Sequence, residues 1–384
     1  MEQLFELAAL LGAALDPASQ AQHLDALVGP VLASVQAMLA HAPALQAHAV
    51  EAGDTLAHKL VFLACSTKGS NRPQEHTEAT YCRVFGAAVA VLGALPAHPA
   101  VRGKFTVVVH RMVPCVRREV LFAALAPALA TLTAAPGPGL GADESKDLEI
   151  LLPLLSQIMV HAGPEATPVL DPLLLPTLQR LIDDMAAATG DGGGDTAVPA
   201  AQVAATVGGM QRQYLLFIHS IAHNTPSLLA SPINAPHLSA VLLQVATAIT
   251  DVSDPVIKKL CISTIAGLIA AWLPSPPPAI DVPFFTAFLD EVAAAALGCV
   301  IAPSFRPKDA NSSRIIGEAA RLLWDLYSHG GDGFLARLTA VLPAQGFPAD
   351  AAQRVAASLR GATSSGPVEK AVRDAVSAIS RGGR

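Results

Sequence analysis

The chain has 384 residues, of which 52% are apolar and 15% charged, and its formal net charge is −6. The negative balance argues against a protein that binds nucleic acid through bulk positive charge. The apolar content raises the question of membrane spans, which need about 20 apolar residues in a row. The best candidate, Leu260–Trp272, follows two lysines and ends before Pro274, so it is too short and we expect no membrane insertion.

Apolar stretches rich in Ala and Leu recur along the chain at helical spacing, with almost no strand pattern between them. Prolines and glycines concentrate in the gaps, where they end helices. The pattern predicts helices, in chain order, at 2–15, 18–40, 43–64, 75–94, 98–114, 117–133, 144–162, 168–188, 200–223, 236–250, 255–273, 283–300, 310–329 and 348–380, the last broken near 361–366. Consecutive helix pairs of this kind predict an all-α fold, an α-solenoid of about seven pairs.

Two of these helices carry clear signals in their residues. The helix at 144–162 has one apolar stripe at helical spacing, made by Leu148, Leu151, Leu152, Leu155, Ile158 and Met159. At the start of the helix at 255–273, Asp254 is predicted as the N-cap and Pro255 as the first helical residue. Each apolar stripe must pack on a neighbouring helix.

The chain shows no linker that would separate independent cores. We therefore expect one elongated domain over residues 1–384, with flexible loops near 135–143, 190–199 and 274–282. Five widely spaced cysteines within apolar segments favour reduced core thiols over a disulfide framework or a zinc site. The N-terminus lacks the features of a signal peptide, so we expect an intracellular protein.

Catalytic patterns are weak in this sequence. His219 and His223 have the spacing of a metal-binding pair on a helix, but no Glu follows His219, so the zinc-protease pattern fails. The glycine-rich run at 191–195 is acidic and lacks the Lys of a phosphate-binding loop. We therefore expect no enzyme, no catalytic residue and neither a metal nor another cofactor, although a metal-dependent enzyme that uses the two histidines stays a weaker alternative.

Charge is distributed unevenly. Residues 135–300 hold five basic and fifteen acidic groups, whereas residues 301–384 hold eleven and seven. The densest positive stretch lies earlier, at Arg102, Lys104, His110, Arg111, Arg117 and Arg118. It is open to two interpretations, a solvated helix face with ordinary capping or a ridge that contacts phosphates.

Short strings along the chain recur in the order and spacing of one known family. They are His110-Arg111-Met112-Val113, Cys115, Glu119-Val120-Leu121, Lys146-Asp147-Leu148, Leu152-Pro153-Leu154, Arg212 with Tyr214, Asp254-Pro255 with Lys259 and Cys261, Trp272, Phe285 with Phe288, and Ala302-Pro303. From about residue 45 to the C-terminus, the chain resembles the C-terminal part of the exportin-T family, within the importin-β or karyopherin superfamily.

The resemblance implies a right-handed superhelix of HEAT-like repeats that binds tRNA together with Ran-GTP in the nucleus and releases it in the cytoplasm. A member of this family shuttles between nucleus and cytoplasm and catalyses nothing itself. The N-terminal repeats, through which relatives meet Ran and nuclear pore proteins, have no counterpart here. We therefore expect the chain to be a C-terminal portion or a truncated form of such a receptor.

The candidate tRNA contacts are the basic residues that match the family together with one later cluster: Arg111, Arg212, Lys259, Arg306, Lys308 and Arg314. The pair Arg117-Arg118 departs from the family pattern and is left out. The candidate acidic residues facing Ran are Asp143, Glu144, Asp183 and Asp184, for which helix capping and loop solubility are the other explanation. A HEAT-type protein-interaction scaffold or another karyopherin-like factor without RNA binding is the alternative function, which the negative net charge favours.

Overall fold

A computed structural model describes residues 1–70, 72–134, 144–190, 200–278, 280–302, 305–307 and 309–382. Within these ranges every regular element is a helix, which confirms the predicted all-α solenoid class. The chain divides into two compact units, Met1–Tyr214 and Leu215–Arg384. That the units form one continuous domain, and that the stack has a right-handed superhelical sense, stay predictions.

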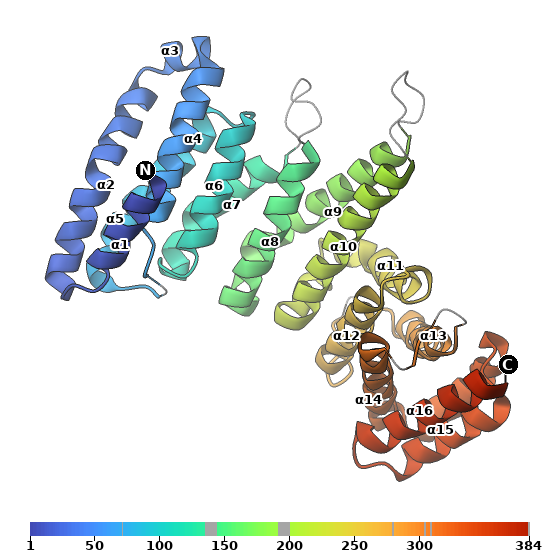
Figure 1. The fold of residues 1–384 in the computed structure, drawn as a ribbon. Helices are drawn as coiled ribbons and strands as arrows, with labels where there is room; N and C mark the ends of the chain where they lie inside the picture. The colour runs from blue at the N-terminus through green and yellow to red at the C-terminus, as the bar shows by residue number, and fades with distance from the viewer. Residues whose placement is uncertain are drawn as a thin grey trace. The chain divides into compact units, whose positions relative to one another are not determined.

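Unit 1 stacks its helices in two rows (Figure 1). Its elements are α1 (Glu2–Gly12), α2 (Pro17–Ala40), α3 (Ala42–Ala47), α4 (Ala49–Cys65), α5 (Glu75–Ala94), α6 (Pro99–Met112), α7 (Arg118–Thr133), α8 (Glu144–Ala162) and α9 (Thr167–Gly190). In one row α4, α6 and α8 pack side by side, and in the other α2, α5, α7 and α9 do so. Helix α1 lies on α2 and α4. Each helix therefore buries one stripe against its own row and another against the facing row.

Unit 2 repeats this arrangement. Helix α10 (Ala200–Asn224) enters it at Leu215 and is followed by α11 (Leu238–Asp251), α12 (Pro255–Trp272), α13 (Val282–Ile301), α14 (Ala310–Val341), α15 (Ala349–Gly361) and α16 (Ser365–Gly382). One row contains α12, α14 and α16, and α11 packs beside α13 in the other. Neighbouring helices of one row thus bring side chains from distant parts of the sequence together.

The signals in the two helices singled out from the sequence are borne out. The stripe of α8 is buried throughout, from Leu148 to Met159. Asp254 caps α12 by accepting a hydrogen bond of 2.8 Å from the backbone N–H of Val256, and Pro255 is the first helical residue. These local rules set where helices begin, and the stripes set which side faces inward.

Two predicted helices differ clearly from the structure, whereas other helix ends are shifted by at most three residues. The helix expected at 43–64 is divided at His48 into α3 and α4. The helix expected at 310–329 ends as predicted at Gly331, whose φ of 52° and ψ of −145° are not helical, but a second helical segment that was not predicted follows to Val341, and the two segments together are labelled α14. Gly331 therefore separates two helical segments, at a φ that suits a residue without a Cβ. The loop predicted near 135–143 lies outside the described residues, and so does the loop predicted near 190–199, except for Gly190, which is the last residue of α9 (Thr167–Gly190).

Three described helices are long and apolar enough to cross a membrane by length and composition, namely α2, α12 and α13. The length argument made from the sequence was therefore wrong for α12, because this helix begins at Pro255 and reaches 18 residues. In the most apolar 18-residue stretch of each helix, 50% of the residues of α12 and 56% of those of α13 are buried in the protein, against 22% for α2. The apolar side chains of α12 and α13 are thus largely used in packing on neighbouring helices.

Candidate nucleic-acid interface

Three cations from consecutive helices of one row gather in unit 2. Lys259 on α12 lies 3.7 Å, Nζ to Oε1, from Glu318 on α14. Arg314 is exposed and stands one helical turn before Glu318, and Arg373 on α16 donates a hydrogen bond of 3.1 Å to the hydroxyl of Ser313. We call Lys259, Arg314 and Arg373 the cationic strip. It spreads three cations over three neighbouring helices, and two of them are paired with carboxylates, Lys259 with Glu318 and Arg373 with Glu369.

Local sequence features place these helices close enough to form the strip. Asp309 caps α14 by accepting a hydrogen bond of 2.9 Å from the backbone N–H of Ser312, and this bond is the first cause that lowers the pKa of the Asp309 carboxyl. Gly317 on α14 faces α16, where a Cβ would lie 3.6 Å from Oε2 of Glu369. A Cβ at position 317 would make only an ordinary contact there, beside the Glu369 and Arg373 side chains, which are joined by a hydrogen bond of 2.5 Å.

The two histidines of α10 lie beside this strip, with ring centroids 4.1 Å apart. Nδ1 of His219 donates to the hydroxyl of Thr264 at 3.1 Å, because that hydroxyl donates in turn to the carbonyl of Leu260. Burial, then His223 and Lys259, lower the pKa of His219 to about 4, so the ring is neutral at pH 7. Among the described residues, no group of three or more His, Cys, Asp or Glu is placed to hold a metal ion.

Acidification is expected to destabilise the protein partly through His219. Its pKa falls from an ordinary value of 6.5 to about 4 on folding, so between these values the unfolded state binds more protons. The free energy of unfolding therefore decreases as the pH falls through this window. Urea midpoints at pH 7 and pH 5 should differ more for the wild type than for His219→Gln. Equal differences would show that His219 does not contribute.

Arg111, the first family-matching cation, is already engaged within unit 1. Its guanidinium donates a hydrogen bond of 2.7 Å to Glu6 on α1, and Nζ of Lys68 lies 3.8 Å from the other oxygen of the same carboxylate. The hydrogen bond from Arg111 is the first cause that lowers the pKa of Glu6, against the opposing effect of burial. The contact joins residues 105 positions apart in the sequence.

The rest of the dense positive stretch is mostly structural. Arg102 is only 2% exposed and donates hydrogen bonds to backbone carbonyls, among them those of Thr131 and Leu132 at the end of α7. Arg117 bonds to Glu78 at 2.5 Å and Arg118 to Glu165 at 3.1 Å. Capping and ion pairing therefore account for these three residues, and no continuous phosphate-binding ridge follows from them.

The remaining predicted residues are placed as follows. Arg212 is exposed on α10, and Arg306 is exposed in the segment before α14. Lys308 and Asp143 lie outside the described residues, and Glu144 begins α8. On α9, Asp183 is exposed and accepts a hydrogen bond of 2.8 Å from the amide of Gln179, whereas Asp184 is partly buried.

Sequence reasoning missed Arg373 in the strip and Glu6 beside Arg111. The partner of Arg373, Ser313, is 60 residues away, so no local motif could reveal the pair. The sequence of α16 does carry one usable signal, the helical spacing of the apolar residues Val368, Val372, Ala375 and Val376, all of which are buried. This spacing places Arg373 on the opposite, polar side of the helix.

Two rows of stacked helices with charged side chains gathered across one row define an α-helical repeat protein, a class that works through its surface. The Exportin-T family model matches residues 3–372, and the chain belongs to this family.

Relatives in this family are much longer than the chain. The chain is 31% identical over 134 residues to Exportin-T of Coprinopsis cinerea, a match that covers 33% of this chain and 13% of the relative. It is 24% identical over 223 residues to Exportin-T of Danio rerio, covering 57% and 22%, and 23% identical over 163 residues to that of Mus musculus, covering 42% and 15%. The chain thus spans less than a quarter of each of these three relatives.

Proposed function

We propose that this chain binds tRNA and takes part in its Ran-GTP-dependent export from the nucleus to the cytoplasm. The observation that carries the proposal is the family match over residues 3–372. The cationic strip supplies a surface that suits the ligand, since cations on adjacent helices can contact successive phosphates of a folded RNA. The proposal assigns the chain no catalytic step.

Recognition at this surface would depend on RNA shape and backbone. The chain has few aromatic residues, with two Trp, three Tyr and twelve Phe, and Tyr81 and Tyr214 are buried. Base stacking on aromatic side chains, which single-strand binders use, is therefore poorly supported. Lys and Arg that contact phosphates position a folded RNA without reading its bases.

The remaining partners follow from the same proposal. Asp183 and Asp184, together with Asp143 and Glu144, are the acidic residues we propose to face Ran. Contacts with nuclear pore proteins would belong to the parts of the receptor that are not in this chain. Under this proposal the protein moves between nucleus and cytoplasm. The apolar helices α12 and α13 then pack within the helical stack and do not span a membrane.

Removing charge from the cationic strip tests the proposal. Lys259→Ala and Arg314→Ala are each expected to weaken tRNA binding about fivefold, as for one exposed ion pair of about 1 kcal/mol. Each should also reduce the slope of log affinity against log salt by about 1. Filter binding or fluorescence anisotropy at several salt concentrations measures both quantities.

The matched control is Arg354→Ala, which removes the same charge from α15, where Arg354 pairs with Asp350 at 2.6 Å. It should leave affinity and slope nearly unchanged. Equal losses in all three variants would mean that general charge, and not the strip, governs binding.

The second candidate is a HEAT-type scaffold or karyopherin-like factor that binds proteins and no RNA. One observation favours it: several arginines of unit 2 are already bound to acids of the same chain, as in Arg337 with Asp290 at 2.6 Å and Arg360 with Asp332 at 3.0 Å. Under this alternative, wild type and strip variants would show the same weak binding to tRNA, with no change in salt slope.

A further inference from the structure

Three donors from separate parts of unit 1 converge on the carboxylate of Glu6. Arg111 on α6 donates at 2.7 Å, Lys68 after α4 lies at 3.8 Å, and the thiol of Cys65 donates at 3.7 Å. Glu6 is the only anionic group in this cluster of four side chains. Without Glu6, the same site would present a guanidinium, an ammonium and a thiol, the donor set of an anion-binding site.

Helix α1, which carries Glu6, is weakly held. Ala9 and Gly12 are its only buried residues, while three leucines of its outer side are largely exposed, Leu4 at 67%, Leu7 at 51% and Leu11 at 62%. Phe5 packs on Phe62 of α4, with ring centroids 5.4 Å apart. The Glu6 contacts therefore add polar attachment to a helix with little apolar burial.

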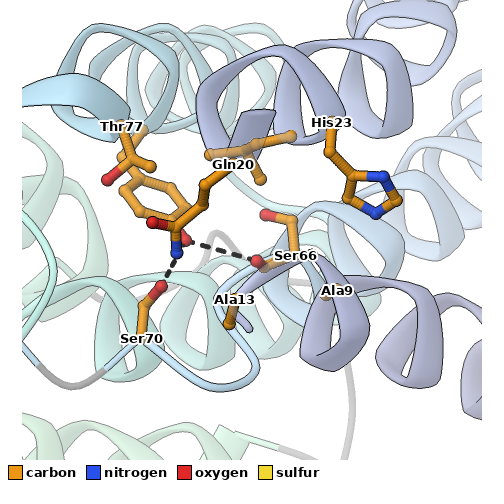
Figure 2. A pocket seen from close by; sticks show the side chains of 10 residues that line it. Ala9, Ala13, Gln20, His23, Ser66, Ser70 and Thr77 are labelled. Carbon is orange, nitrogen blue, oxygen red and sulfur yellow. Dashed lines mark hydrogen bonds between the residues drawn. The ribbon is translucent and has the colours of Figure 1, made fainter. Parts of the chain in front are cut away.

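The polar side chains under α1 already have hydrogen-bond partners outside this helix. Figure 2 shows the small pocket there, lined among others by Gln20, Ser66 and Ser70. Tyr81 also lines it. The hydroxyls of Ser70 and Tyr81 are 2.7 Å apart, and that of Tyr81 donates to the carbonyl of Ser66 at 3.4 Å. Gln20 accepts a hydrogen bond from His76 on α5. These bonds would persist if α1 moved.

Helix α1 and its C-cap residue contribute only small residues to the lining of this pocket, Ala9, Gly12 and Ala13. One hydrogen bond crosses the contact, from the ring of His23 on α2 to the carbonyl of Ala8 at 2.9 Å. Moving α1 would therefore break few hydrogen bonds other than those of Glu6, so the release of one carboxylate could free the helix.

We propose that Arg111 and Lys68 form a phosphate-binding site for RNA, and that Glu6 occupies this site in the free protein as a built-in competitor. The inference rests on the proposed RNA-binding function and adds a second, covered site in unit 1 to the cationic strip of unit 2. A backbone phosphate has the same charge as the carboxylate and offers acceptor oxygens for the same donors. RNA would have to displace Glu6 to reach Arg111.

Glu6→Gln tests the site, because it removes the competing charge with little change in shape. With full-length tRNA as the probe, this variant is expected to bind about fivefold more tightly than the wild type, with a salt slope steeper by about 1 to 2. In the double variant Glu6→Gln/Arg111→Ala the gain should disappear. Amide hydrogen exchange of residues 5–12 should speed up when tRNA is added to the wild type.

The matched control is Glu291→Gln, the same substitution at an exposed position of α13 in the other unit. An equal gain there, or a gain that survives Arg111→Ala, would overturn the inference. Binding of tRNA by the wild type with no effect of Glu6→Gln would overturn the inference alone. Absence of tRNA binding in both the wild type and Glu6→Gln would overturn the proposed function as well.

Discussion

Replacing Arg102 with Met is expected to lower the free energy of unfolding by about 3 kcal/mol, in the range for loss of a buried, hydrogen-bonded charged group. The Arg102 guanidinium donates to the carbonyls of Pro96, Thr131, Leu132 and Ala134 at 2.7 to 3.3 Å. Three of these carbonyls belong to the C-terminal end of α7, where a cation also interacts favourably with the helix dipole. Methionine would fill the space and leave the carbonyls without this donor.

Urea unfolding followed by circular dichroism measures this loss. Lys104→Met is the matched control, because Lys104 is exposed on the same helix, α6, and the substitution should change stability by no more than about 0.5 kcal/mol. The loss of stability for Arg102→Lys should lie between those of the two methionine variants, since an ammonium cannot reproduce the planar guanidinium that donates to several carbonyls. A loss below 1 kcal/mol for Arg102→Met would refute the structural role given to this arginine.

Replacing Trp272 with Ala is expected to destabilise the protein by about 4 kcal/mol, within the range for removal of a large buried aromatic side chain. Trp272 is 2% exposed at the end of α12 and meets Phe285 of α13 edge to face, with ring centroids 5.9 Å apart. Phe285 also stacks on Phe288 at 6.2 Å. The substitution would therefore open a cavity between two successive helices and remove an aromatic contact.

Trp272→Phe is the comparison that separates the two effects, since it keeps an aromatic ring and most of the volume. It should lose about 1 to 2 kcal/mol, less than half the loss of the alanine variant. The second tryptophan of the chain, Trp324, remains in both variants as a fluorescence reporter of urea unfolding. Equal losses of stability for Trp272→Phe and Trp272→Ala would mean that contacts specific to the indole ring, and not the cavity, account for the effect.

The helices could be predicted closely because their determinants are local. The ranges 75–94 and 144–162 agree with α5 and α8 residue for residue, since apolar stripes and flanking Pro, Gly or polar residues act within a few positions. The second helical segment of α14, after Gly331, was missed, because the glycine correctly predicts a helix end but does not show whether another helix follows. The division at His48 had no comparable signal.

The candidate sites were less accessible to sequence reasoning, because long-range partners decide whether a cation is free. Arg102 and Arg111 lie nine residues apart in one basic stretch and look alike in the sequence. In the structure, Arg102 caps a helix whose last carbonyls are about 30 residues away in sequence, and Arg111 meets Glu6 at a separation of 105. Such contacts follow from how helices stack in rows, which composition and spacing do not specify.

The central claim is that this chain binds folded tRNA. The most direct measurement is the affinity of the purified chain for mature tRNA and for an unprocessed precursor, at two salt concentrations, with and without Ran-GTP. We predict salt-sensitive binding that prefers mature tRNA and is strengthened by Ran-GTP, because linked ligands raise each other's affinity. No binding under any of these conditions would contradict the claim, and equal binding to both RNAs would contradict the predicted preference for mature tRNA.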